Sequence, residues 1–126
     1  MGKQKEGSLQ ERIQNLVKKR GGYCKKNWGS MISEPGVPDI TVGYKGIHIT
    51  IEVKVDENNP TRQQGIHCRN LWKAGNIAFV TWDTFTVNEI LEHVDWCIDN
   101  NYSLRDLILE IKAFILEYKI DDGTKW

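Results

Sequence analysis

The sequence predicts a mixed α/β domain, of the α+β type, in which helices flank a sheet with both antiparallel and parallel strands. Three observations support this class. An early segment has apolar residues at helical spacing, residues 47–54 alternate between apolar and polar side chains, and a later apolar run is separated from that alternation by a helix. The alternating strand forms a hairpin with the strand before it, whereas the later run needs a crossover, so the sheet must be mixed.

The length and composition fit a single domain spanning residues 1–126. Of the 126 residues, 40% are hydrophobic and 27% are charged, which allows a core that needs no disulfide or metal. No apolar run is long enough to cross a membrane, and the polar start of the chain has no signal-peptide pattern. We therefore expect a cytoplasmic protein without a membrane partner.

The three cysteines, Cys24, Cys68 and Cys97, are expected to be reduced and partly buried. They are odd in number, far apart and without a CxxC pair, and free cysteine is among the most buried residue types. No Cys/His set has zinc-finger spacing.

The first predicted element is a helix from about Ser8 to Arg20, with a start that could lie nearer Glu6. Its apolar residues recur at intervals of three and four, at Leu9, Ile13, Leu16 and Val17. Gly21-Gly22 ends this helix. A short strand is expected over 23–28, followed by a loop at 29–38 that contains serine, glycine and two prolines.

A hairpin is the central prediction. A short strand over 39–42 and a turn at 44–46 bring the chain back into the alternating strand 47–54. Side chains two residues apart in a strand point to the same side, so Glu52 and Lys54 share its polar face.

A helix and a strand follow the hairpin. Thr61 and Gln64 have the spacing of a capping box, which predicts a helix that continues to about Ala74 and is ended by Gly75. The apolar run 77–81 predicts a strand that is covered on both faces.

Two further helices are expected in the last third of the chain. A second capping box is predicted at Thr86 and Glu89, and the helix that it starts ends at 100–101, while Ser103 caps the last helix. The tail from Asp121 is polar and is expected to be frayed. The last helix carries a broad apolar stripe that could pack on the core or bury a dimer interface. It is formed by Leu104, Leu107, Ile108, Ile111, Phe114, Ile115 and Tyr118.

Charge is unevenly distributed along a chain whose net charge is zero. Residues 1–30 have a balance of +6 and residues 83–126 a balance of −6, an asymmetry that can hide a nucleic-acid-binding face. The candidates for binding nucleic acid are Lys18, Lys19, Lys25, Lys26 and, for stacking on a base, Trp28. The helix dipole alone could explain the cations at the end of the first helix, and Trp28 could instead pack in the core.

Asp39, Glu52 and Lys54 carry the most informative chemistry. Asp39 begins one strand and Glu52 lies late in the next, so the hairpin can bring both carboxylates to one end of the sheet. Neighbouring carboxylates repel each other, and a hard divalent cation relieves that repulsion. With Lys54 on the same side, the trio suits metal-assisted hydrolysis of a phosphodiester. The alternative is a solvent-facing charge pair on a half-exposed strand.

A wider set of motifs resembles the VRR-NUC family of PD-(D/E)xK nucleases, and in particular its stand-alone, phage-type members. The motifs are Glu6-x-x-x-Gln10, Gly36-Val37-Pro38-Asp39-Ile40, Ile51-Glu52-Val53-Lys54, Pro60-Thr61-x-x-Gln64 and Ala74-Gly75. The sequence departs from the family at Asn76, where a second glycine is common. The resemblance covers residues 5–82, the expected core, and a helical extension at about 86–119 matches nothing in the family. The implied fold is a restriction-endonuclease-like mixed-sheet core flanked by helices, with two added C-terminal helices.

The resemblance implies roles for the residues of the hairpin. Asp39 and Glu52 would bind a metal ion, and the backbone carbonyl of Val53 would be a third ligand. Lys54 would be the catalytic lysine. The implied cofactor is Mg²⁺ or Mn²⁺.

Two residues outside the hairpin are also implied. Gln64 would lie near the site, although helix capping explains its position equally well. Glu6 would support the metal through water, but it could instead be a favourable anion in a first helical turn. Glu11, on the same helix, could serve in its place.

The expected function is a metal-dependent DNA endonuclease from a virus or a bacterium. The resemblance implies that it acts on branched DNA, such as a Holliday junction, and that it works as a homodimer. The alternative is a nucleic-acid-binding module with the same fold that does not cut. In a third interpretation the motifs are coincidental and the chain is an interaction domain.

Overall fold

The computed structural model describes residues 5–27 and 38–126. Helices and strands follow one another in the predicted order, and none of the helices in these ranges is long and apolar enough to cross a membrane. The elements are α1 (Glu6–Lys19), β1 (Tyr23–Lys26), β2 (Ile40–Tyr44), β3 (Ile47–Val53), α2 (Arg62–Lys73), β4 (Ile77–Thr81), α3 (Thr84–Asp99) and α4 (Leu104–Glu117).

The four strands form one mixed sheet in the order β1-β2-β3-β4. β1 and β3 each pair antiparallel with β2, whereas β4 runs parallel to β3 and is reached through α2. The hairpin between β2 and β3 turns through Lys45 and Gly46, whose φ angles of 50° and 83° are the left-handed pair that a two-residue hairpin turn requires. The predicted mixed sheet is therefore confirmed.

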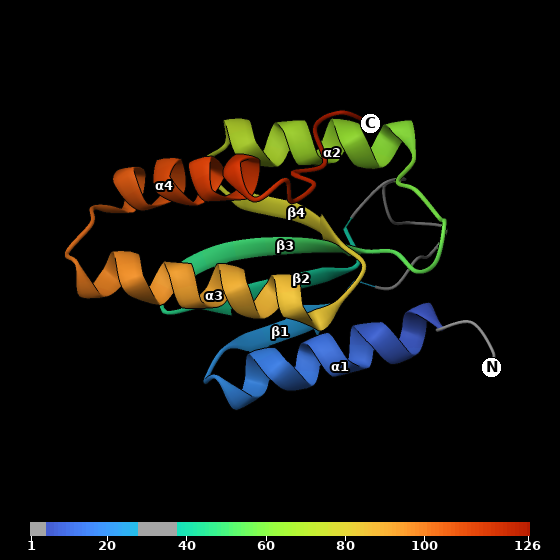
Figure 1. The fold of residues 1–126 in the computed structure, drawn as a ribbon, viewed down its shortest axis with the longest axis horizontal. Coiled ribbons are helices and arrows are strands. Elements are labelled where there is room, and N and C mark those ends of the chain that lie inside the picture. Colours follow the sequence, from blue (N-terminus) through green and yellow to red (C-terminus); the bar gives the residue numbers. More distant parts are fainter. Residues whose placement is uncertain (1–4, 28–37) are drawn as a thin grey trace.

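Helices cover both faces of the sheet (Figure 1). α1 and α3 lie over the face that β3 forms with Ile49, Ile51 and Val53, all of which are at most 1% exposed. α2 covers the other face, where Thr50 and Glu52 are 4% and 1% exposed. The polar face of the alternating strand is thus buried in its second half, and that buried region contains Glu52.

α4 packs against α3 beside the β4 edge of the sheet (Figure 1). The apolar stripe predicted for this helix is narrower than expected. Leu107, Ile111 and Ile115 are buried in the core, whereas Leu104 and Tyr118, at its two ends, are 61% and 64% exposed.

The C-terminal tail is packed on the core, and the expectation of a frayed end is wrong. Asp121 forms a β-bridge with Val80, whose backbone N–H donates to the Asp121 carbonyl over 2.7 Å. Trp72 of α2 donates its indole N–H to the Asp122 carbonyl, and the Asp122 carboxylate pairs with Lys112 of α4. The tail therefore covers part of the otherwise open edge of β4.

α3 begins earlier than predicted, because its cap is Asp83 rather than Thr86. The Asp83 side chain accepts a hydrogen bond from Thr86 N over 2.8 Å, so the second predicted capping box, with Glu89, is wrong. The caps predicted at Thr61 and Ser103 are confirmed.

The three cysteines are free and buried, as predicted. Cys24 lies in β1, Cys68 in α2 and Cys97 in α3. Burial raises the pKa of each thiol, and it raises that of Cys68 to about 12.

Asp95 of α3 joins the extension to the core. Its Oδ2 accepts hydrogen bonds from Arg20 Nη2 and Tyr44 Oη, both over 3.0 Å, and its Oδ1 lies 2.6 Å from Lys45 Nζ. Burial raises the pKa of Asp95, but the contacts with Lys45, Tyr44 and Arg20 outweigh that effect and hold the pKa below its ordinary value. One carboxylate thus links the end of α1, the β2–β3 hairpin and α3.

Replacing Asp95 with alanine is expected to lower the free energy of unfolding by roughly 1–3 kcal/mol. The substitution leaves the Arg20 guanidinium, which is 22% exposed, without its carboxylate. Urea unfolding measures the effect, and the matched control is Asp99→Ala, an exposed carboxylate one turn later. If the two variants lose the same free energy of unfolding, the contacts of Asp95 stabilise the fold no more than an exposed charge does.

Candidate active site

The residues predicted to carry chemistry gather at one end of the sheet. Figure 1 shows the carboxyl ends of β3 and β4 at the same end of the molecule as the first turns of α1, α2 and α3. Helix N-termini carry partial positive charge, so this end of the molecule favours an anionic ligand such as a phosphate group.

Glu52 is buried at this end of β3, with 1% of the residue exposed. Its Oε1 accepts a hydrogen bond from Gln64 Nε2 over 2.6 Å and lies 3.5 Å from Lys54 Nζ. Its Oε2 has no hydrogen-bond partner within the described residues. Because the Lys54 side chain is only 14% exposed, a solvent-facing charge pair is excluded. A buried carboxylate oxygen without a donor is costly unless a ligand compensates for it.

Asp39 lies directly before β2, and the pairing of Ile40 with Ile51 places it beside the end of β3. Its Oδ2 accepts a hydrogen bond from Val53 N over 2.8 Å. In an extended strand the N–H and C=O of one residue point to the same side, so the Val53 carbonyl also faces Asp39. The structure therefore brings the Asp39 and Glu52 carboxylates together, with the Val53 backbone beside them.

Asn27 fixes the backbone around Asp39, a role that sequence reasoning missed. Its Nδ2 donates to the Pro38 carbonyl over 2.9 Å and to Thr41 Oγ1 over 2.8 Å, and its N–H donates to the Asp39 carbonyl over 2.7 Å. Asn27 thus holds the chain on both sides of Asp39. A single asparagine after a short strand gives no signal for this role, because its side-chain partners lie 11 and 14 residues away.

Gln64 caps α2 and also contacts Glu52. Its Oε1 accepts a hydrogen bond from Thr61 N over 2.7 Å, and Thr61 Oγ1 accepts from Gln64 N, which completes the capping box. Its Nε2 remains available and donates to Glu52. The cap therefore fixes the amide in the orientation that presents a donor to the site.

Glu6, rather than Glu11, lies near the site. Burial raises the pKa of Glu6 and the Asp39 carboxylate raises it further, whereas Lys54 lowers it, so Glu6 is close to both residues. Glu11 is exposed. One turn after Glu6, Gln10 is 4% exposed, and its Oε1 has no partner in the part of the chain that the structure describes.

The charges at the site fit a divalent cation. Burial raises the pKa of Glu52 to about 9, and the Asp39 carboxylate adds to this rise while Lys54 opposes it. Two carboxylates, a carbonyl and water form the kind of oxygen ligand set that Mg²⁺ prefers. Within residues 5–27 and 38–126, no three His, Cys, Asp or Glu side chains form a metal site by themselves.

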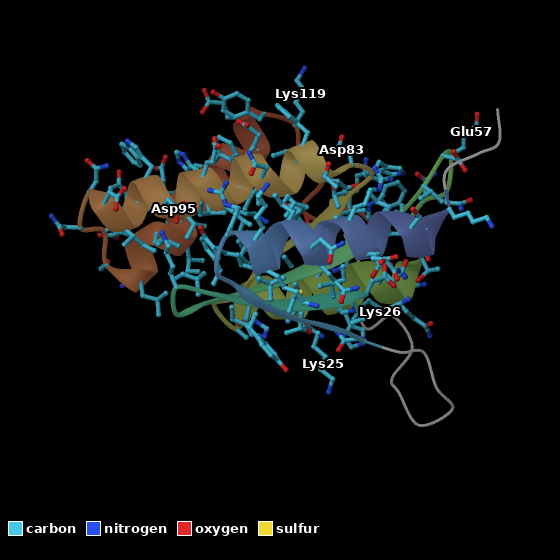
Figure 2. The ribbon with its side chains drawn as sticks, turned by 90° about the horizontal axis from the view of Figure 1, so that it is seen from below. Lys25, Lys26, Glu57, Asp83, Asp95 and Lys119 are labelled. Carbon is cyan, nitrogen blue, oxygen red and sulfur yellow. The ribbon has the colours of Figure 1, made fainter. Side chains whose placement is uncertain are left out.

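Lys26 is the basic candidate that the structure brings to the site, since it is one of the charges that lower the pKa of Glu6. Lys25 is exposed, and Figure 2 shows it projecting from the side of the molecule opposite to Lys119. Lys18 and Lys19 lie in the last turn of α1, about 20 Å along the helix from Glu6. The candidate Trp28 lies outside the described residues.

Known structures are similar to this fold. No protein-family model and no curated protein matches the chain. A solved structure described as a VRR_NUC domain matches with 30% sequence identity and a TM-score of 0.60, and the match covers 70% of this chain and 95% of that one. Another is Hjc of Archaeoglobus fulgidus, described as a Holliday junction resolvase from an archaeal hyperthermophile. It matches with 18% identity and a TM-score of 0.50, over 61% of this chain and 67% of that one, which is a likeness of fold.

Proposed function

Since this chain belongs to the VRR-NUC family of PD-(D/E)xK nucleases and has their restriction-endonuclease-like fold, we propose that it is a metal-dependent endonuclease that hydrolyses phosphodiester bonds in DNA. The observation that carries the proposal is the buried Glu52, whose Oε2 lacks a partner among the described residues beside Asp39 and Lys54. A module that only binds DNA gains nothing from the buried Glu52 and the half-buried Asp39 at a surface that must face phosphates, because like charges repel.

In this proposal the metal ligands come from the end of the hairpin. Asp39, Glu52 and the Val53 carbonyl would hold Mg²⁺ or Mn²⁺, and Glu6 would contribute through water. When bound, the ion supplies a Lewis acid for the phosphoryl oxygens and lowers the pKa of the attacking water.

Two side chains act around those ligands. Lys54 places its ammonium group where negative charge develops on the phosphoryl oxygens, and stabilisation of that charge lowers the barrier to hydrolysis. Gln64 holds Glu52 in position, since its own amide is fixed by the cap of α2. A carboxylate held in this way needs no reorganisation during the reaction.

Branched DNA is the proposed substrate class, and a homodimer is the proposed active form. The chain shares its fold with a Holliday junction resolvase, which makes the four-way junction the first substrate to test. α4 supplies an apolar surface suited to a second copy, because several of its large side chains stay exposed. They are Leu104, Leu109 and Leu116, each about 60% exposed.

Replacing Lys26 with glutamine is expected to weaken DNA binding and to reduce the slope of log K against log salt concentration by about 0.9, the share of one phosphate contact. The double variant Lys18→Gln, Lys19→Gln removes two charges at the other end of α1 and is expected to change the slope less. Fluorescence anisotropy at several salt concentrations measures both slopes. A larger change in the double variant would instead place the DNA along α1.

Cleavage of labelled four-way junction, flap, single-stranded and linear duplex DNA tests the proposed function. We expect cutting of at least one branched substrate in Mg²⁺ or Mn²⁺, none in EDTA, and cutting about 100- to 1,000-fold slower with Lys54→Ala. Binding without cutting in either metal would overturn the nuclease assignment and leave a DNA-binding module. Sedimentation of the same samples gives the oligomeric state.

A further inference from the structure

A pocket of about 350 Å³ lies where the nuclease core meets the C-terminal extension. It is lined by the carboxyl end of β4, the first turn of α3 and the tail from residue 118 onward. Figure 2 shows Asp83 and Lys119, which come from these two sides of the pocket, on the same side of the molecule. None of the roles assigned above uses this pocket.

Aromatic rings and cations dominate the lining. Trp82, Tyr118 and Trp126 contribute rings, and Lys119 and Lys125 contribute ammonium groups. Tyr118 is 64% exposed, and Lys125 Nζ lies 4.5 Å from the centroid of the Trp126 ring. Such a lining favours a flat aromatic ligand that carries negative charge beside it.

The two carboxylates in the pocket are already engaged by the protein. Asp83 Oδ1 accepts the capping hydrogen bond from Thr86 N over 2.8 Å. Asp121 accepts from Gly123 N and from Trp126 Nε1, each over 2.8 Å, and lies 3.9 Å from Lys125 Nζ. A ligand therefore meets the rings and Lys119, together with the exposed Asp83, whose Oδ1 is held by Thr86 N.

The pocket adjoins the proposed active site on the β3 side. Lys54 N donates to the carbonyl of Thr81, which lines the pocket, over 3.0 Å. Trp82 Nε1 donates over 3.2 Å to the carbonyl of Asn58, in the loop that leads from Lys54 to α2. Neighbouring strands lie about 4.8 Å apart, so the backbone of Lys54 lies beside this pocket.

The pocket also adjoins the site on the α2 side. Trp126 lies directly over Gly65, since a Cβ at that position would come within 2.2 Å of the Trp126 backbone. Gly65 follows Gln64, which donates to Glu52. The last residue of the tail is thus one wall of the pocket and a neighbour of the proposed metal site.

We propose that this pocket binds an unpaired nucleobase next to the phosphodiester bond that is cut. The inference rests on the proposed function, because it assigns the pocket to the same DNA substrate. The volume lies at the lower end of the range of about 300–1,000 Å³ typical of small-ligand sites, which suits one nucleotide and excludes a duplex. Aromatic rings stack on any base, and Lys119 supplies a cation for a phosphate that flanks it.

Such a pocket selects for DNA structure without reading sequence. A base at a branch point or in a flap is already unpaired, so it enters the pocket at no cost in base pairing. A base in a continuous duplex must first leave its stack and its partner, which costs free energy. The pocket therefore supplies a physical reason for the enzyme to prefer branched DNA.

Photo-crosslinking tests where the base lies. Flap DNA carrying 5-iodouracil at the unpaired positions beside the branch is irradiated with Lys54→Ala protein, or with wild type in EDTA, and the crosslinked peptides are mapped. We expect crosslinks to Trp82, Tyr118 or Trp126. Crosslinks that all map elsewhere would overturn the proposal.

Affinity supplies the second test. Trp82→Ala is expected to weaken binding of the flap substrate roughly 5- to 150-fold, the range for loss of one stacked base, while Trp82→Phe restores most of it. Duplex binding should change little in either variant. Trp96→Ala, which removes a 47% exposed tryptophan of α3 away from the pocket, is the matched control and should bind as wild type. Far-ultraviolet circular dichroism of each variant tests whether the native fold is kept.

The outcomes separate this proposal from the nuclease assignment. If wild type cuts branched DNA but Trp82→Ala and the double variant Lys119→Asn, Lys125→Gln bind and cut as wild type does, the pocket proposal fails and the nuclease stands. Asparagine suits position 119 because it tolerates the positive φ of 56° found there. The opposite result is that wild type cuts no substrate, whereas the crosslinks and the loss of flap affinity in Trp82→Ala are both observed. The base-binding pocket then stands and the nuclease assignment fails.

Discussion

Alanine in place of Lys54 is expected to lower the rate constant for DNA cleavage by about 100- to 1,000-fold, with DNA affinity within about tenfold of wild type. The ammonium group lies 3.5 Å from Glu52 Oε1 in a side chain that is 14% exposed, so solvent cannot replace its charge. Single-turnover cleavage of the preferred substrate measures the rate constant, and anisotropy measures the affinity.

The matched control for this variant is Lys73→Ala, which removes an exposed lysine at the far end of α2. It should bind and cut as wild type does. If Lys54→Ala binds DNA much more weakly but cuts bound DNA at the wild-type rate constant, Lys54 is an anchor for the backbone and its proposed role in the reaction is wrong.

Glutamine in place of Glu52 is expected to abolish metal-dependent cleavage and, without divalent cations, to stabilise the fold at pH 8. In the folded wild type, burial raises the pKa of Glu52 from an ordinary value of 4.5 to about 9. Between these pH values the folded state holds a proton that the unfolded state lacks. This proton therefore contributes to the free energy of unfolding. Its contribution is complete below about pH 4.5 and is lost as the pH rises towards 9, by up to about 1.4 kcal/mol per pH unit.

Glutamine carries no titrating proton and keeps an oxygen for the hydrogen bond from Gln64. Thermal unfolding in EDTA from pH 5 to pH 9 should therefore show wild type losing stability relative to Glu52→Gln as the pH rises. Mg²⁺ should make the difference in stability between the two proteins depend less on pH, because an ion that binds the ionised carboxylate stabilises the folded wild type. Parallel curves for the two proteins in EDTA would show that the carboxylate is ionised in the folded protein without help from a cation.

Local patterns in the sequence were sufficient for most of the fold. The alternation over 47–54 predicts β3, and the spacing of Thr61 and Gln64 predicts the start of α2, because each signal depends on residues a few positions apart. The tail could not be predicted in this way. Its position depends on Trp72 and Arg69 of α2, which donate hydrogen bonds to carbonyls 50 and 55 residues later. The start of α3 was missed for a local reason, since Asp83 and Thr86 compete as caps and the pattern favours neither.

The candidate site shows the same division. A hairpin fixes the relative positions of Asp39, Glu52 and Lys54, so their proximity follows from the sequence and is present in the structure. The burial of Glu52 does not follow, because alternation identifies a polar face without showing which helix covers it. Lys18 and Lys19 belong to the basic N-terminal segment, yet charge counted along a sequence cannot show that a helix carries them to the opposite end of the molecule from Glu6.

The buried cysteines make the molecule a reporter of its own local unfolding. A thiol reacts with a disulfide reagent only after its surroundings open and it ionises. Cys24, Cys68 and Cys97 lie in β1, α2 and α3, so their labelling rates report three separate regions. The tail backbone at Gly123 lies directly against Cys68, since a Cβ at that glycine would come within 2.3 Å of its Sγ. Detachment of the tail would therefore speed the labelling of Cys68 alone, and unfolding of the whole domain would speed all three.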